Sequence, residues 1–297
     1  MDATITSRSV SGTLREPDWF VPSMADGEED EYVTPADLLS ATLRRDAAAP
    51  LLTTYDDADG SRIELSAATF ANWVAKSANL LQDEFDVGRD SVVALSLPVH
   101  WQTAAVLLGV WSCGGTVLDT AAEDDGRLAE ADVVLAAWDR LDALADAGVE
   151  ELVGLSLHPL GMGMSGYAGP ARDFALEVRA HGDAFFPYEP PDPAAPGLIA
   201  GGLELTLGGL TEAATELAAR LGLVAGDRVL VDERTAAEAG PVAWLLSPLS
   251  AGASLVLCRN ADHTDHAALA ARAAGERITA TLGRRIEGVR ELGRPDP

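Results

Sequence analysis

The chain has 297 residues, of which 47% are hydrophobic, and it carries a formal net charge of −26 at pH 7. This length and hydrophobic content are enough to bury the core of one large α/β domain or of two smaller ones. The acidic balance excludes nucleic acid and anionic membrane surfaces as expected partners, because both are bound through cationic contacts.

Lys76 is the only lysine, so arginine supplies almost all of the positive charge. Acidic proteins with little lysine are typical of a salt-rich, halophilic cytoplasm, since the screening length falls to ~3 Å at about 1 M salt. A GC-rich genome, which favours Arg, Ala, Gly and Asp codons, gives the same composition. Both explanations stay open.

The sequence lacks a signal-peptide pattern and any apolar run of about 18 residues, so we expect a cytoplasmic protein without membrane association. Cys113 and Cys258 each lie at the end of an apolar run. Both are predicted to be small core residues rather than a disulfide or a nucleophile.

The sequence pattern of the first part of the chain changes at Thr34-Pro35. Residues 1–33 are Ser/Thr-rich and then acidic, without periodicity, which predicts a disordered acidic tail. Thr34-Pro35 is typical of a helix start. The stretch Leu51–Leu65 predicts two short strands around the turn Asp56–Gly60, and Ser66 can cap the helix that follows.

Apolar runs then alternate with helical patterns, which predicts an α/β fold with mainly parallel sheets, because strands buried on both faces are almost continuously apolar. The predicted strands are Val92–Leu97, Asp132–Ala136, Glu151–Leu155, Arg228–Asp232, Ser254–Cys258 and Ile278–Thr281. The predicted helices lie near 101–113, 140–147, 171–180, 211–221, 241–250 and 265–274.

Five prolines between Pro187 and Pro196 exclude a helix or a central strand there. We therefore predict a tail at 1–33, a first subdomain at 34–186, a linker at 187–197 and a second subdomain at 198–297. The two halves look alike, because Asp90 and Asp227, and Gly115 and Gly252, match at one offset of 137 residues. This spacing favours two related subdomains with a ligand-binding cleft between them.

Two segments carry a resemblance to a known family. The early segment contains VGRDSVVALSLPVHWQTAAVLLGVWSCGGTVLD, and the later one contains LGLVAGDRVLV and GPVAWLLSPLSAGASLVL. Their spacing and apolar pattern resemble the adenylate-forming superfamily of AMP-binding acyl-CoA synthetases and ligases, over residues 35–282. The chain is most similar to a short, degenerate actinobacterial branch that corresponds to the N-terminal part only. The resemblance implies the fold of that N-terminal domain and makes ATP, AMP or CoA the candidate cofactors.

The stretch AGGLELTLGGLT departs from that family, whose active members have a phosphate loop of the form [ST]-S-G-T-T-G-x-P-K-G at this place. Here the hydroxyl run and the lysine are missing, and five residues separate Gly201-Gly202 from Gly208-Gly209. A phosphate cradle needs clustered N–H donors on one turn. We therefore predict a strand at Leu203–Leu207 between two glycine turns, and a helix that begins at Thr211 with Glu212 in its first turn.

The resemblance also implies that the adenine-contacting motifs and the small lysine-bearing domain belong beyond the last residue given. Lys76 is expected to face solvent on an early helix, and no motif gathers the cationic groups that a triphosphate needs. Unaided adenylation is therefore not expected.

Three histidine-containing segments are weaker candidates. The loop LSLHPLGMGMSGYAG follows a strand, where α/β proteins bind ligands, so His158, Gly161 and Gly163 are candidate contacts, although an ordinary connection is the commoner reading. His263 and His266 with nearby aspartates could hold a metal, but a solvated helix start is favoured, so no metal site is predicted. His100 is predicted to be a structural residue at a helix start.

These observations favour a non-enzyme: a degenerate AMP-binding-like protein, a pseudoenzyme, that binds a small ligand or a partner in its cleft. The candidate ligand contacts are His158, Gly161, Gly163, Gly201, Gly202, Gly208, Gly209 and Thr211, and no catalytic residue is assigned. The alternatives are an acyl-CoA ligase completed by another chain and a pure interaction module.

Overall fold

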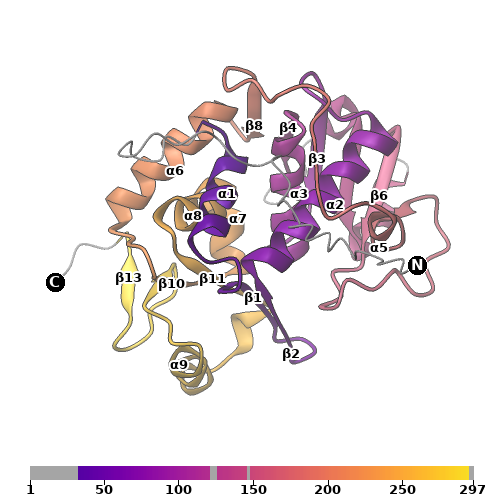
Figure 1. Cartoon of the computed structure of the whole chain (residues 1–297). Coiled ribbons are helices and arrows are strands. Elements are labelled where there is room, and N and C mark those ends of the chain that lie inside the picture. The colour runs from indigo at the N-terminus through magenta and orange to yellow at the C-terminus, as the bar shows by residue number, and fades with distance from the viewer. Residues whose placement is uncertain (1–32, 121–125, 146–147, 294–297) are drawn as a thin grey trace, which may run out of the picture. The chain divides into compact units, whose positions relative to one another are not determined.

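The computed structural model describes residues 33–120, 126–145 and 148–293 (Figure 1). The predicted acidic tail lies outside these ranges except for Val33. The described part of the chain contains two mainly parallel sheets with flanking helices, as predicted.

Sheet B has seven strands, which are β3 (Val92–Ser96), β4 (Thr116–Asp119), β5 (Val133–Ala137), β6 (Glu151–Leu155), β7 (Arg172–Asp173), β8 (Pro196–Ala200) and β9 (Leu203–Thr206). Their order is β7-β6-β5-β3-β4-β8-β9. Neighbours are parallel except for the antiparallel β8–β9 hairpin at one edge. Every residue of β5 is buried, as expected for a parallel strand covered on both faces.

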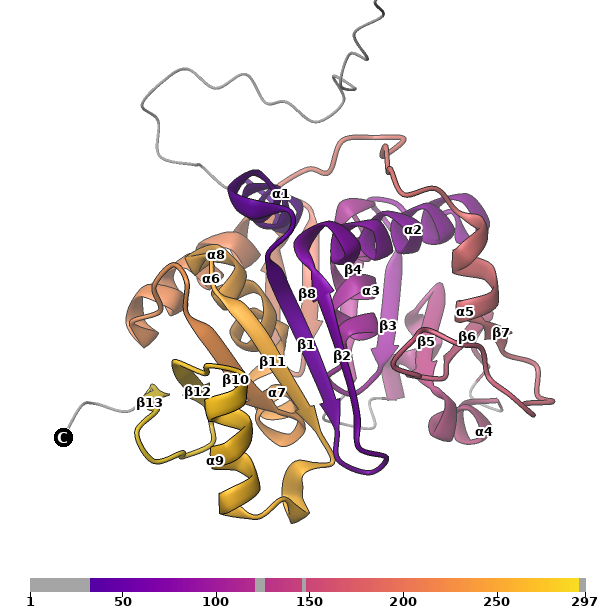
Figure 2. The same cartoon turned by 60° about the horizontal axis from the view of Figure 1, so that its bottom comes forward.

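Sheet A has six strands, which are β1 (Pro50–Asp56), β2 (Ser61–Ser66), β10 (Arg228–Asp232), β11 (Ser254–Arg259), β12 (Ala280–Leu282) and β13 (Arg290–Leu292). Their order is β13-β12-β10-β11-β1-β2. The β1–β2 hairpin is antiparallel and the other neighbours are parallel. Figure 2 shows β1 between β2 and β11, although about 200 residues separate β1 from β11 in the chain.

The longer helices surround both sheets, and they are α1 (Pro35–Asp46), α2 (Ala67–Phe85), α3 (Trp101–Ser112), α6 (Leu207–Leu221), α7 (Glu233–Pro241), α8 (Ser247–Ala251) and α9 (His266–Gly275). Helix α3 contacts α2, β4 of sheet B and β1 of sheet A. It is buried from Trp101 to Trp111 because α2 and strands of both sheets pack around it. None of the helices in the described ranges is long and apolar enough to cross a bilayer.

The two sheets do not correspond to the two subdomains predicted on either side of residues 187–197. The β1–β2 hairpin precedes this segment but pairs with β11 in sheet A, whereas the β8–β9 hairpin begins at its end and joins sheet B through the pairing of β8 with β4. The proline-rich segment therefore passes between two parts of sheet B. It does not separate one sheet from the other.

Polar side chains of α2 bind the backbone that leads into the proline-rich segment. Lys76 Nζ donates to His181 O at 2.5 Å and lies 3.0 Å from a carboxylate oxygen of Asp183. One turn further on, Asn79 donates to the carbonyl oxygens of Gly182 and Ala184. The expectation that Lys76 faces solvent holds only in part, because its side chain is 23% exposed and these contacts hold it against the chain.

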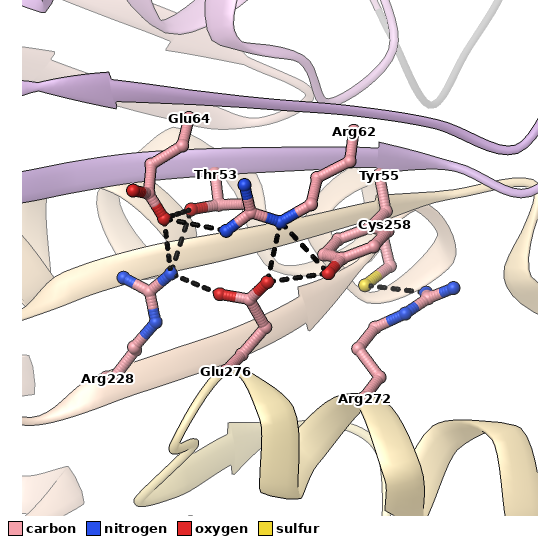
Figure 3. Close-up of polar contacts among 8 residues, drawn as sticks. All are labelled: Thr53, Tyr55, Arg62, Glu64, Arg228, Cys258, Arg272 and Glu276. Carbon is pink, nitrogen blue, oxygen red and sulfur yellow. Dashed lines mark hydrogen bonds and ion pairs between the residues drawn. The ribbon is translucent and has the colours of Figure 1, made fainter.

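A polar network fastens the β1–β2 hairpin to the end of α9 (Figure 3). The carboxylate of Glu276, which is 8% exposed, accepts from Tyr55 at 2.6 Å, Arg62 Nε at 2.7 Å and Arg228 Nη2 at 2.6 Å. Burial alone would raise the pKa of Glu276, but hydrogen bonds from these three side chains outweigh burial and lower it from 4.5 to about 2.

Both cysteines are buried and free, as predicted. Burial raises the pKa of the Cys258 thiol to about 11, although Arg272 lies 3.3 Å from its sulfur (Figure 3). Burial also raises the pKa of Cys113. Neither thiol has the lowered pKa of a reactive cysteine.

Candidate functional site

A cavity of about 400 Å³ lies where the carboxyl ends of strands from both sheets meet. Asp119 at the end of β4, Asp232 at the end of β10 and Arg259 at the end of β11 all line it. Ligands of α/β proteins collect at this end of parallel strands. We call this cavity the cleft.

The wall from sheet B combines an apolar surface with one charged turn. Leu97, Pro98 and Val99 follow β3, and they lead into α3. The 3-10 turn Trp138–Arg140 follows β5 and brings Asp139 and Arg140 to the cleft. Arg140 Nη1 donates to Ser96 Oγ at 2.6 Å, and no carboxylate of the described ranges pairs with it.

The wall from sheet A is the start of α7. Asp232 caps this helix by accepting from Thr235 N at 2.8 Å, which places Glu233 and Arg234 in the first turn beside the cleft. Further along, Gly240 has φ 73°, and the π-helix Val242–Leu246 follows. The non-helical Gly240 kinks the chain before this π-helix, and π-helical turns are frequent at functional sites.

Two further arginines of the cleft are neutralised by carboxylates. Arg259 Nη1 lies 3.0 Å from a carboxylate oxygen of Asp56. Arg284 Nε pairs with Asp232, and its Nη2 lies 3.3 Å from Asp262. Burial alone would raise the pKa of Asp232, but hydrogen bonds from Thr235 and Arg284 outweigh it and lower that pKa.

A second chamber of about 260 Å³ adjoins the cleft, and Asp119, Ala237 and Pro241 line both. Its remaining lining is mainly small or apolar, and it comprises Leu198, Ala200, Gly201, Leu203, Glu238, Ala239, Gly240 and Val242. The β8–β9 hairpin therefore forms one wall of this chamber.

Comparison with known proteins places the chain in a family. No family model matches the sequence. A TIGR03089 family protein of Mycobacterium tuberculosis is 44% identical over 254 residues, which cover 82% of this chain and 96% of the relative. The chain belongs to the TIGR03089 family.

Solved structures share the fold of this TIGR03089 family member. The anthranilate-CoA ligase AuaEII, solved with anthranoyl-AMP, matches 86% of the chain with a TM-score of 0.67 and 15% identity. A Brucella canis acyl-CoA synthetase matches 87% with a TM-score of 0.66 and 17% identity. The N-terminal domain of FACL13 from Mycobacterium tuberculosis matches 84% with a TM-score of 0.62 and 14% identity.

At these identities the likeness establishes the fold, which is that of the N-terminal domain of acyl-CoA synthetases. The chain spans about half the length of the two full ligase chains, with 49% of each covered.

The glycine-rich stretch of this TIGR03089 family member is a hairpin followed directly by a helix. Gly201 has φ 56° and forms the turn with Gly202, and β9 is the predicted strand. The second predicted glycine turn is wrong, because α6 begins at Leu207 and contains Gly208, Gly209 and Thr211 in its first turns. The cap at Thr206 and the burial of Leu207 and Leu210 stabilise the helix despite the poor helix propensity of two glycines.

The first N–H groups of α6 are already bound within the protein. Leu207 N donates to Ala195 O at 2.9 Å, Gly208 N to Pro193 O at 2.8 Å and Gly209 N to Thr206 Oγ1 at 3.0 Å. Because a phosphate cradle requires free N–H groups, this helix start cannot serve as one without breaking those bonds. Glu212 lies beyond the first turn, contrary to the prediction.

The loop that contains His158, Gly161 and Gly163 does not line the cleft or the second chamber. Its backbone is tied down, since Gly161 N donates to His158 O at 2.8 Å and Arg179 Nη2 donates to Gly161 O at 2.6 Å. A methyl group on Gly161 would lie 3.0 Å from Trp73, so the glycine permits close packing.

The two weaker histidine candidates lie at helix starts. His100 caps α3 by accepting from Gln102 N at 3.2 Å, as predicted, and burial holds its pKa well below the usual value. Asp265 caps α9, which then begins at His266. Among the described residues, no group of three or more His, Cys, Asp or Glu side chains is arranged to hold a metal ion.

Sequence reasoning missed the charged residues of the cleft. Asp139 and Arg140 follow β5 within three residues, and Glu233 and Arg234 directly follow β10. The available signal was their position, because charged residues just after an apolar strand lie at the carboxyl edge of the sheet.

Proposed function

We propose that this protein binds a small ligand in the cleft and does not catalyse adenylation unaided. The observation that carries the proposal is a cavity of about 400 Å³ at the carboxyl ends of both sheets, whose lining includes charged side chains that have no ion-pair partner among the described residues. Polar and charged groups that converge on a cavity orient a ligand and give specificity.

Two observations support the absence of unaided catalysis. The N–H groups at the start of α6 are bound by the protein, where adenylate-forming enzymes, by the resemblance noted above, hold phosphate. Lys76, the only lysine, is engaged by His181 and Asp183. A triphosphate requires cationic groups and free donors arranged around it.

Two assays on the purified protein test this function. ATP–pyrophosphate exchange, measured with a panel of carboxylic acids at low and high salt, is expected to stay at background. Thermal unfolding with AMP, acyl-CoA, carboxylates and amino acids is expected to reveal stabilisation by at least one class. A ligand at 100 times its Kd adds about 2.7 kcal/mol, or roughly 5–10 °C in Tm.

A matched pair of variants locates the binding. Arg140→Ala combined with Arg234→Ala is expected to abolish stabilisation by the ligand, whereas Arg220→Ala, on the exposed face of α6, leaves it intact. Pyrophosphate exchange by the purified chain contradicts the non-catalytic part of the proposal. Stabilisation that survives the double substitution contradicts the location.

A further inference from the structure

The charges that line the cleft are of both signs, and four of them lack an ion-pair partner within the described ranges. They are Asp139, Arg140, Glu233 and Arg234. Glu233 accepts a backbone hydrogen bond from Asn260 at 3.2 Å, and Arg140 donates to Ser96, but neither contact neutralises the charge. The inference below concerns this same cleft, so it rests on the proposed function.

Each wall presents one acid followed immediately by one arginine. Asp139-Arg140 belongs to the turn after β5 of sheet B, and Glu233-Arg234 belongs to the first turn of α7 after β10 of sheet A. Consecutive residues on a helical turn point in different directions and do not face each other. The acid and the arginine of each wall therefore remain available to a molecule between them.

A ligand of a single charge would fit this lining poorly. A simple anion that approached the arginines would also meet Asp139 and Glu233, within a protein whose net charge is −26. A simple cation would meet Arg140 and Arg234. Like charges brought together in a binding site select against the wrong partner.

We propose that the ligand of the cleft is a small zwitterion that carries a separate cationic and anionic group, as a free amino acid does. Its carboxylate or phosphate binds Arg140 or Arg234, and its ammonium group binds Asp139 or Glu233. The apolar second chamber beside the β8–β9 hairpin accepts an uncharged side chain of that ligand. Both charges of the molecule then find a partner that the protein itself leaves open.

Titration calorimetry with matched trios of compounds tests the inference. Each trio holds an amino acid, the acid that lacks its amino group and the amine that lacks its carboxylate. Suitable trios are leucine with 4-methylpentanoate and 3-methylbutylamine, phenylalanine with 3-phenylpropanoate and 2-phenylethylamine, and 4-aminobutyrate with butyrate and propylamine. In at least one trio the zwitterion is expected to bind about 10-fold more tightly than either analogue, since each charged hydrogen bond is worth about that factor.

Two isosteric variants assign the ammonium partner. Asp139→Asn and Glu233→Gln remove one negative charge each, and at least one is expected to reduce the advantage of the amino acid over its deaminated analogue by about 10-fold. Glu216→Gln, on exposed α6, is the control and is expected to change nothing. Thermal midpoints of all variants report whether they fold.

The outcomes separate the two proposals. If a deaminated acid binds in the cleft as tightly as its amino acid in every trio, the zwitterion inference is overturned while ligand binding in the cleft stands. If the preference survives both Asp139→Asn and Glu233→Gln, the assignment of the acidic residues is wrong. If neither the trios nor AMP, acyl-CoA and simple carboxylates bind, the proposed function itself fails.

Discussion

Replacing Glu276 by glutamine removes the central acceptor of the network that joins the β1–β2 hairpin to α9. The pKa of this carboxyl is lowered from 4.5 to about 2, and one pKa unit corresponds to about 1.4 kcal/mol, so the charged form contributes at most about 3.4 kcal/mol. The side chain is 8% exposed, but its partner Arg62 is 41% exposed, so solvent screening reduces the estimate. We expect Glu276→Gln to lower the free energy of unfolding at pH 7 by about 2–3 kcal/mol.

The sign of the pH dependence follows from the lowered pKa. A carboxyl whose pKa is depressed in the folded protein stabilises it above pH 4.5, and this contribution is lost as the pH falls towards 2. The difference between wild type and Glu276→Gln in urea unfolding should therefore be constant from pH 7 to about 5 and should shrink below that. Glu216→Gln breaks only an exposed pair with Arg220 and should cost less than about 1 kcal/mol. Equal stability of wild type and Glu276→Gln at pH 7 would refute the reasoning.

Three more predictions concern the backbone kink, the lysine and the thiols. Gly240→Ala forces a side chain into φ 73° and should cost about 1–2 kcal/mol in thermal unfolding, whereas Gly202→Ala, with nothing within 4 Å, should be nearly neutral; equal costs would show that the kink is not strained. Lys76→Met removes the contacts with residues 181 and 183, so limited proteolysis of that segment should accelerate, and an unchanged rate would argue against anchoring. Burial raises the pKa of Cys258 to about 11 and that of Cys113 as well, so a thiol reagent at pH 8 should label both only after unfolding, and rapid labelling of the native protein would contradict their burial.

The local elements could be predicted well because their signals are local. Glu151–Leu155 and Arg228–Asp232 are strands with the predicted bounds, since apolar runs of this length are buried on both faces of a parallel sheet. Membership of the sheets could not be predicted, because the pairing of β1 with β11 depends on backbone hydrogen bonds between segments about 200 residues apart. The sequence of neither strand specifies which other strand it pairs with.

The start of α6 shows how local signals compete. Two glycines at 208 and 209 suggested a turn, yet the cap at Thr206 and the burial of Leu207 and Leu210 stabilise a helix through them. The cleft was harder to predict, because whether an arginine is neutralised depends on tertiary contacts. Arg284 and Arg140 look alike in the sequence, but only Arg284 meets a carboxylate in the described part of the chain.

The insertion of β1 between β2 and β11 sets the order in which the two sheets can be finished on the ribosome. Sheet B is complete once β9 ends at Thr206, whereas sheet A lacks its partner for β1 until Ser254–Arg259 has been made. At about 5–20 residues per second, the early hairpin waits roughly 10–40 s for that strand. Leu52 of β1 stays without its β11 partner Leu255 for that time, so the nascent hairpin keeps an unpaired strand edge that is prone to aggregation.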